Sequence, residues 1–192
     1  MSNSPSEDLK GEARRRAFAA RKAAKAANPV AAEQARDAFL GHVVVDAKAS
    51  VVAGYRPIRT ELDPTPLMEA LHAGGVTLCV PVIEGEGQPL SFREWRPGCA
   101  MVEGAFGAEV PADGAWLEPD LLIAPLVAWS QDGWRLGYGG GFYDRTLERL
   151  RGKRPTRAFG YAYAAQELQD LPTEPTDQRL DGMVTETGVL TF

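Results

Sequence analysis

The sequence of 192 residues is poor in cysteine, with only Cys79 and Cys99 and no CxxC pair. This scarcity excludes a disulfide-rich scaffold and a structural zinc site built from paired cysteines. Both thiols are therefore expected to be small buried side chains in a reducing compartment. No apolar run approaches the roughly 20 residues that a membrane-spanning helix needs, and the N-terminal residues lack the apolar core of a signal peptide. We expect a cytoplasmic protein with no membrane partner.

Histidine is also scarce. His42 and His72 each stand alone on a predicted helix, so we expect structural roles for both. No Ser-His-Asp or Cys-His set is recognisable, and the chemistry must come from other residues.

Positive charge is sparse overall, since the net charge is −5, and this argues against a nucleic-acid partner. The exception is residues 10–25, which carry seven basic side chains and one acidic one. Lys10, Arg14, Arg21 and Lys25 are spaced by four, seven and four residues, which places them on one stripe of a helix. Such a stripe is either a solvated basic face or a set of cations aimed at a polyanionic ligand.

Apolar segments of strand length alternate with helical patterns along the chain. We expect helices over 4–27, from about 30 to 41, over 65–73 and from 142 onward. We expect strands over 50–55, 76–83, 91–95, 121–128, 157–164, 183–186 and 189–192. This alternation predicts an α/β fold with a mostly parallel sheet between helical layers. Residues 1–192 form one expected domain, with room for an antiparallel piece within 76–118 and a candidate lid over 97–119.

The richest stretch is residues 121–146, where an apolar run leads through a turn and Arg135 into a loop of four glycines. A predicted helix follows, opened by Phe142. A strand, a glycine loop and a helix N-terminus together present backbone N–H groups to an anion. The loop lacks the last glycine of GxGxxG and has no GKS or GKT, which disfavours a dinucleotide fingerprint and a P-loop. Asp144, in the first helical turn, is either a magnesium ligand or a carboxylate favoured by the helix dipole.

The motif RLGYGGGFYDRTL, residues 135–147, preceded by PLVAW, closely resembles the signature of the 5-formyltetrahydrofolate cyclo-ligase (5,10-methenyltetrahydrofolate synthetase) family. Further matches follow in the family's order and cover nearly the whole chain. They are Lys10-x-x-x-Arg14, Glu61-Leu62-Asp63, Val80-Pro81, Asp177, Leu180-Asp181 and Val184-Thr185-Glu186.

The resemblance implies a three-layer α/β/α sandwich of the sugar-phosphate isomerase and CoA transferase type. It also implies a set of ATP-binding residues, which comprises Lys10, Arg14, Arg135, Leu136, Gly137, Tyr138, Gly139, Gly140, Gly141, Phe142 and Tyr143. Four of these, Lys10, Arg14, Arg135 and Tyr143, are implied to be catalytic. The implied folate-binding residues are Arg14, Arg56, Glu61, Tyr138, Gly139, Gly140, Gly141 and Phe142. Asp144 and Asp177 are the implied Mg²⁺ ligands.

The implied reaction uses ATP as co-substrate. The formyl oxygen of 5-formyltetrahydrofolate attacks the γ-phosphate, and the other folate nitrogen then attacks the phosphorylated formyl group. Ring closure gives 5,10-methenyltetrahydrofolate, ADP and phosphate. We expect a monomer whose partners are these two substrates, with no nucleic acid.

Three positions depart from the commonest family pattern. Trp129-Ser130 replaces Phe-Asp, so a carboxylate is missing before the turn, and Asp132 is a candidate substitute. Phe142 replaces the first of two tyrosines, and Arg56 stands where an apolar or aromatic residue is common. These departures keep open a paralogue that binds folate or nucleotide but has altered or lost the cyclo-ligase activity. A different alternative is a nucleic-acid binder that grips phosphates with residues 10–25.

Overall fold

A computed structural model describes residues 5–46 and 50–192. Within these ranges the helices are α1 (Pro5–Ala27), α2 (Ala31–His42), α3 (Thr65–Ala73) and α4 (Phe142–Arg151), with short 3₁₀ helices η1 (Ala105–Gly107) and η2 (Ala164–Gln166). The strands are β1 (Val51–Ala53), β2 (Thr77–Val82), β3 (Ser91–Trp95), β4 (Met101–Glu103), β5 (Glu109–Pro111), β6 (Leu121–Ala124), β7 (Ala128–Trp129), β8 (Arg135–Leu136), β9 (Arg157–Tyr161), β10 (Gly182–Thr185) and β11 (Gly188–Thr191). All four predicted helices are confirmed, although residue 4, the first of the expected helix 4–27, lies outside the described residues.

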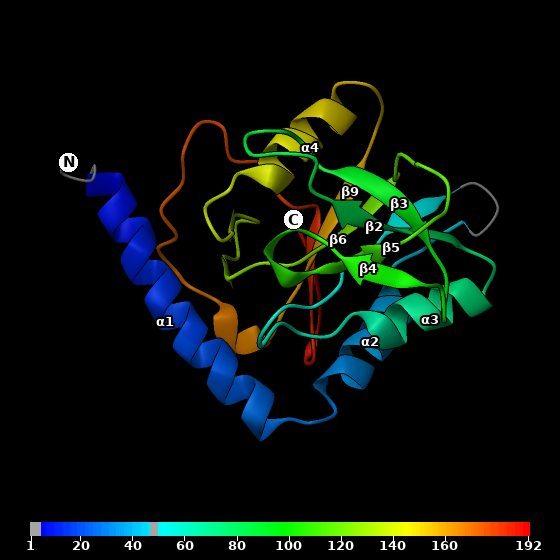
Figure 1. Cartoon of the computed structure of the whole chain (residues 1–192). Coiled ribbons are helices and arrows are strands. Elements are labelled where there is room, and N and C mark those ends of the chain that lie inside the picture. The colour runs from blue at the N-terminus through cyan, green and yellow to red at the C-terminus, as the bar shows by residue number, and fades with distance from the viewer. Residues whose placement is uncertain (1–4, 47–49) are drawn as a thin grey trace.

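The central sheet has seven strands in the order β11-β10-β9-β6-β1-β2-β3. The five inner strands run parallel, whereas β3 and β11 pair antiparallel at the two edges. This arrangement confirms the predicted α/β fold with a mostly parallel sheet (Figure 1).

Side chains alternate between the two faces of this sheet, as the pleat of a strand requires. One face carries Val52, Leu78, Leu121, Phe159 and Val184, which share a buried cluster with residues of α2 and α3. The other carries Ala53, Cys79, Leu122, Ala158 and Met183, which pack with residues of α4. Helices therefore cover both faces, and the three-layer arrangement is confirmed. The likeness to sugar-phosphate isomerases and CoA transferases stays a prediction.

One strand prediction was wrong at a proline residue. The expected strand 121–128 ends at Ala124, because Pro125 has no N–H to donate to a neighbouring strand. The chain pairs again only as the β7–β8 hairpin. Pro81, by contrast, lies inside β2 and does not end it. The pairing of β2 with β1 ends at Cys79, and beyond it β2 pairs with β3, so one side of the strand at Pro81 needs no donor.

The segment 97–119, the candidate lid, contains an antiparallel hairpin of β4 and β5, which agrees with the antiparallel piece expected within 76–118. Its second strand contacts β2 and β3. Whether this hairpin closes over a ligand stays a prediction.

Helix α1 lies to one side of the sheet layers (Figure 1). Its small residues Ala13 and Ala17 are buried with Val127, Ala128 and Leu136, and the helix also contacts η2. No helix in the described ranges combines the length and the apolar character needed to cross a membrane.

Candidate active site

The candidate site lies at the carboxyl ends of the central parallel strands. The loop that holds Glu61 follows β1, and the segment that leads to the glycine loop follows β6, its parallel neighbour. The carboxyl ends of parallel strands all lie at the same end of the sheet, where ligands of α/β proteins commonly bind. Helix α1 and the late loop 171–179 reach the same place through the contacts described below.

The glycine loop leaves the N-terminus of α4 open. Gly141 is the N-cap of α4 in the left-handed conformation (φ +63°), and no side chain among the described residues caps it. A Cβ at this position would lie 2.7 Å from Nη1 of Arg145. The first N–H groups of a helix have no partner within the helix, and residues 137–140 are exposed. This geometry agrees with the predicted anion cradle.

Arg135 joins the start of the glycine loop to α4 and to the late loop. Its guanidinium is nearly buried, with Nη2 3.0 Å from Oδ1 of Asp144 and Nη1 donating to the carbonyl of Gln178 at 2.8 Å. The same Asp144 oxygen accepts the backbone N–H of Gln178 at 2.9 Å. The predicted metal ligand Asp144 is therefore held by a cation and by the residue that follows Asp177.

Lys10 connects α1 to the late loop. Its Nζ lies 3.3 Å from Asp177 Oδ2 and 3.2 Å from Glu174 Oε2, and the residue is only 8% exposed. One turn later, Arg14 donates from Nε to the carbonyl of Gly137 at 2.9 Å. The interpretation of a fully solvated basic stripe is wrong for Lys10, because this cation faces the candidate site.

Asp144 and Asp177 were predicted to hold Mg²⁺, and their surroundings fit that ion. Gln178 donates to Asp144 and directly follows Asp177, so the backbone next to Asp177 lies beside Asp144, while the two carboxylates pair with different cations, Arg135 and Lys10. In the described part of the chain, no cluster of three or more His, Cys, Asp or Glu side chains is arranged to hold a metal. Two carboxylates completed by phosphate oxygens and water suit Mg²⁺, whereas a closed zinc site needs four protein ligands.

Glu61 meets the glycine loop directly. Its carboxylate is 4% exposed, and it accepts the N–H of Ile58 at 2.8 Å and the hydroxyl of Tyr138 at 2.9 Å. Burial raises the pKa of Glu61 above its ordinary value, while these two hydrogen bonds and the charges of Arg21 and Arg59 oppose the shift. Burial, together with the charge of Glu61, raises the pKa of Tyr138 to about 12. The predicted folate carboxylate and the predicted ATP loop are thus in contact.

Leu136, Phe142 and Tyr143 of the motif are buried or partly buried. The hydroxyl of Tyr143 is buried with no hydrogen-bond partner among the described residues, and its pKa is raised by that burial. Phe142 packs under the guanidinium of Arg145, whose carbon lies 5.6 Å from the ring centre. Leu136 is buried in the cluster with Ala13, so only its backbone is placed to meet a ligand.

Arg56 is directed toward the β4–β5 hairpin. Its guanidinium contacts Thr65 Oγ1 at 3.4 Å and Glu109 Oε2 at 3.8 Å. The structure therefore does not bring Arg56 into contact with Glu61, and its predicted role toward folate is untested.

Arg21 is a site residue that sequence reasoning missed. It is 1% exposed, donates from Nε to Thr60 Oγ1 at 3.0 Å, and lies 4.0 Å from Glu61 Oε1. The signal was present, because Arg21 follows Arg14 by seven residues on the basic stripe. What the stripe could not reveal is that the side chain is buried beside a carboxylate.

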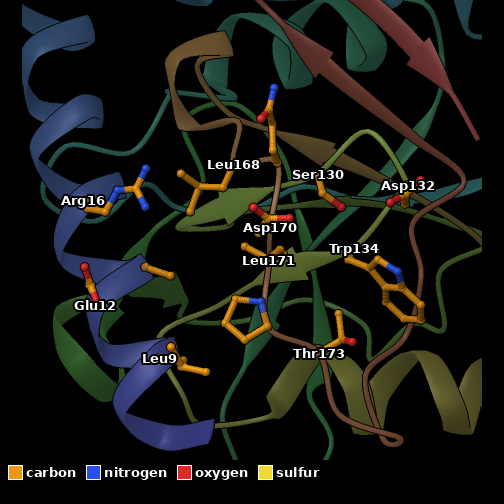
Figure 2. Close-up of a pocket in the computed structure, with 13 residues that line it drawn as sticks. Leu9, Glu12, Arg16, Ser130, Asp132, Trp134, Leu168, Asp170, Leu171 and Thr173 are labelled. Carbon is orange, nitrogen blue, oxygen red and sulfur yellow. The ribbon is translucent and has the colours of Figure 1, made fainter.

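A cavity of about 570 Å³ adjoins this region on a neighbouring face of α1. Figure 2 shows residues of α1 on one side of it and Trp134 on the other, with the segment 168–173 between them. Ser130 and Asp132 both line the cavity, and the hydroxyl oxygen of Ser130 is buried without a partner among the described residues. The candidate substitute carboxylate thus shares a cavity with the position where the family usually has aspartate.

The fold and the site define a three-layer α/β protein whose glycine loop leaves the N-terminus of α4 without a side-chain cap, at the carboxyl ends of the parallel strands. Comparison with known proteins is more specific: residues 6–186 match the model of the 5-formyltetrahydrofolate cyclo-ligase family, and the chain belongs to that family. The 5-formyltetrahydrofolate cyclo-ligase of Escherichia coli K12 is 36% identical over 147 residues, which cover 73% of this chain and 80% of that protein.

Solved structures agree with this assignment. The structure of Aquifex aeolicus 5,10-methenyltetrahydrofolate synthetase is 29% identical, with a TM-score of 0.74, and the alignment covers 95% of this chain and 92% of that one. The synthetase of Mycoplasma pneumoniae shares the fold at 21% identity and a TM-score of 0.68, with 95% and 99% of the two chains covered.

Proposed function

We propose that this protein converts 5-formyltetrahydrofolate to 5,10-methenyltetrahydrofolate with consumption of ATP and Mg²⁺ and release of ADP and phosphate. The hydrogen bond from Tyr138 to Glu61 carries the proposal, because it joins the loop suited to phosphates to the carboxylate suited to a pterin. The family membership and the named relatives support the same reaction.

The phosphate groups of ATP are assigned to the backbone N–H groups of residues 137–141 and to three cations. Lys10 and Arg14 approach from α1, and Arg135 approaches from β8. Fixed positive groups of this kind stabilise the charge that spreads over a phosphoryl group during transfer. Mg²⁺, held by Asp144 and Asp177 when bound, would neutralise further phosphate charge and help to orient the transferred group.

Glu61 is assigned to the N–H groups of the pterin ring. An ionised carboxylate only accepts hydrogen bonds, and bonds from N–H donors to it are strong. The contact between Glu61 and Tyr138 supports a position of the formyl group beside the glycine loop when a pterin is bound to Glu61. The side chains thus contribute positioning and charge stabilisation rather than a covalent nucleophile. Ring closure then follows on the phosphorylated formyl group, within the folate itself.

The adenosine part of ATP is assigned to the cavity beside α1. Three residues of its wall each precede a residue of the proposed phosphate site: Leu9 precedes Lys10, Trp134 precedes Arg135, and Thr173 precedes Glu174, a partner of Lys10. The wall also offers apolar side chains for a purine ring and carboxylates for its amino group. Figure 2 shows Leu171 and Trp134 among these side chains.

The proposal includes a monomeric state and a cytoplasmic location. The nucleic-acid alternative is disfavoured, because Lys10 and Arg21 of the basic stripe are buried against other parts of the protein. A paralogue that binds folate or nucleotide without turnover remains the second candidate, favoured by Ser130 at a position where the family usually has a carboxylate.

One assay tests the proposal. The purified protein is mixed with 5-formyltetrahydrofolate, ATP and Mg²⁺, and the near-ultraviolet absorbance of the methenyl product is followed. We expect product formation that requires all three additions. A folded protein that binds both substrates yet forms no product would favour the inactive paralogue, and one that binds neither would refute the proposal.

A further inference from the structure

We propose that Arg21 is a positioning residue of the folate site, which keeps Glu61 ionised and oriented without touching the substrate. The inference rests on the proposed role of Glu61 as the pterin acceptor. Arg21 is not among the residues that the family motifs assign to ATP, folate or Mg²⁺.

The first observation is the degree of burial. Arg21 is one of the largest fully buried side chains in the described residues, at 1% exposure. A buried guanidinium is costly unless nearby groups compensate its charge. Its Nε donates to Oγ1 of Thr60, the residue before Glu61, and the acidic group that it faces is Glu61 itself, 4.0 Å from Nη1.

The second observation is that Nη1 is left without a hydrogen bond by the described residues. A residue that served only to attach α1 would be expected to satisfy its buried donors. Here the free donor lies beside the carboxylate, at a distance where charge attraction acts without a direct hydrogen bond. This geometry favours control of the Glu61 charge over simple anchoring.

Arg21 also reaches the glycine loop. Its guanidinium carbon lies 5.1 Å from the ring centre of Phe18 and 5.7 Å from that of Tyr138, and the two rings are 5.7 Å apart. The Tyr138 hydroxyl in turn donates to Glu61. One buried cation therefore contacts both the acceptor and the residue that links this acceptor to the phosphate loop.

The groups that act on Glu61 come from several elements. Arg21 approaches from α1 and Tyr138 from the glycine loop, while Arg59 lies in Glu61's own loop. The charge of Glu61 also helps to raise the pKa of the phenols of Tyr55 and Tyr143. Burial raises the pKa of Glu61 and Arg21 opposes that rise. Removal of the Arg21 charge should therefore make Glu61 take up a proton at higher pH.

The test is the pH dependence of the folate KM under saturating ATP and Mg²⁺. In the wild type, this KM should rise as the pH falls through the pKa of Glu61. In Arg21→Gln, the rise should begin at a pH higher by about one unit or more, since a neighbouring opposite charge shifts a carboxyl pKa by one to three units. Arg21→Lys, which keeps the charge, should restore most of the wild-type profile. Lys22→Gln, on an exposed neighbour in α1, should leave it unchanged.

A double-mutant comparison separates this effect from a general loss of structure. Glu61→Gln should raise the folate KM and abolish its rise at low pH. The double variant Glu61→Gln/Arg21→Gln should likewise show no rise of the folate KM at low pH. A milder variant, Thr60→Val, removes the hydroxyl to which Arg21 donates and should shift the profile in the same direction by less. It keeps the test available if Arg21→Gln does not fold.

The outcomes are distinguishable. If Glu61→Gln leaves the folate KM unchanged, the proposed role of Glu61 fails, and this inference fails with it. If Glu61→Gln raises that KM but Arg21→Gln and Thr60→Val keep the wild-type pH profile, only the role of Arg21 is overturned.

Discussion

Nη2 of Arg135 lies 3.0 Å from Oδ1 of Asp144, so a proposed phosphate-binding cation and a proposed metal ligand form one ion pair. The Asp144 oxygen is shared with the N–H of Gln178. Asp144 would hold a magnesium ion close to the Arg135 guanidinium, and the negative charge of ATP phosphates would reduce the repulsion between the two cations. If the proposed roles hold, this ion pair would make metal binding and nucleotide binding depend on each other.

Asp144→Asn should lower the turnover rate on the order of 100-fold and raise the Mg²⁺ concentration needed for half-maximal rate. A metal ion supplies several kcal/mol of charge stabilisation in such reactions, and each ~1.4 kcal/mol corresponds to a factor of ten. The measurement is a Mg²⁺ titration of the initial rate. Glu148→Gln, on an exposed position of α4, is the matched control. An unchanged Mg²⁺ requirement in Asp144→Asn would refute the metal role.

Lys10→Gln should raise the KM for ATP about 10- to 100-fold and leave the folate KM within about a factor of two. The lost contact is a hydrogen bond between charged groups, worth about 1.5–3 kcal/mol. Its loss also removes the positive charge of Lys10 beside Asp177 and Glu174, near the incoming phosphates. Steady-state kinetics with each substrate varied in turn measures both constants. Equal effects on the two would contradict the assignment of Lys10 to ATP.

The Glu61 carboxyl should give the protein a pH-dependent stability. Because burial raises the pKa of this group above its ordinary value of 4.5, the folded state holds a proton that the unfolded chain has already released. Stability therefore falls as the pH rises from about 4.5 through the folded pKa, and the loss is complete above that pKa. Glu61→Gln lacks this titration.

Urea unfolding of both proteins between pH 4.5 and 8 checks this expectation. The free energy of unfolding of the wild type should decrease relative to that of Glu61→Gln as the pH rises, and then level off. A difference that stays constant over the range would show that Glu61 titrates alike in the folded and unfolded states.

Thr173→Trp should raise the KM for ATP several-fold without changing the folate KM. Thr173 is exposed and lines the cavity assigned to adenosine, so a tryptophan there occupies ligand space at little cost to the core. Kinetics with ATP varied measures the effect. The control is Thr176→Trp, an exposed position of the same loop outside the cavity wall. If both variants keep the wild-type ATP constant, adenosine binds elsewhere.

Predictions from the sequence were most accurate for helices and strands whose structure depends on residues nearby in the chain. The expected bounds of the helix at 65–73 and of the strand at 91–95 agree with α3 and β3, because both are short patterns between clear turn or proline signals. The glycine motif likewise predicted the open N-terminus of α4, since strand, loop and helix are adjacent in the chain.

Prediction was weaker where structure depends on distant pairing. The β4–β5 hairpin needs contacts with β2 and β3, which its own composition does not encode. The burial of Arg21 depends on Thr60, 39 residues away, so its spacing on the basic stripe could not distinguish a solvated cation from a buried one. The roles proposed for Lys10, Arg14, Glu61 and Asp177 stay predictions, although the structure brings Lys10 to Asp177 and Arg14 to the glycine loop.

The ion pair of Lys10 and Asp177 joins residues 167 positions apart. On a ribosome, which adds about 5–20 residues per second, α1 emerges many seconds before its partner in the late loop exists. Long-range contacts of this kind also form late in folding, because the intervening chain must first be ordered. The central sheet is itself complete only after β10 and β11 have been made, since both strands follow Asp177 in the chain. We therefore expect the contact between α1 and the late loop to form together with the last strands of the sheet.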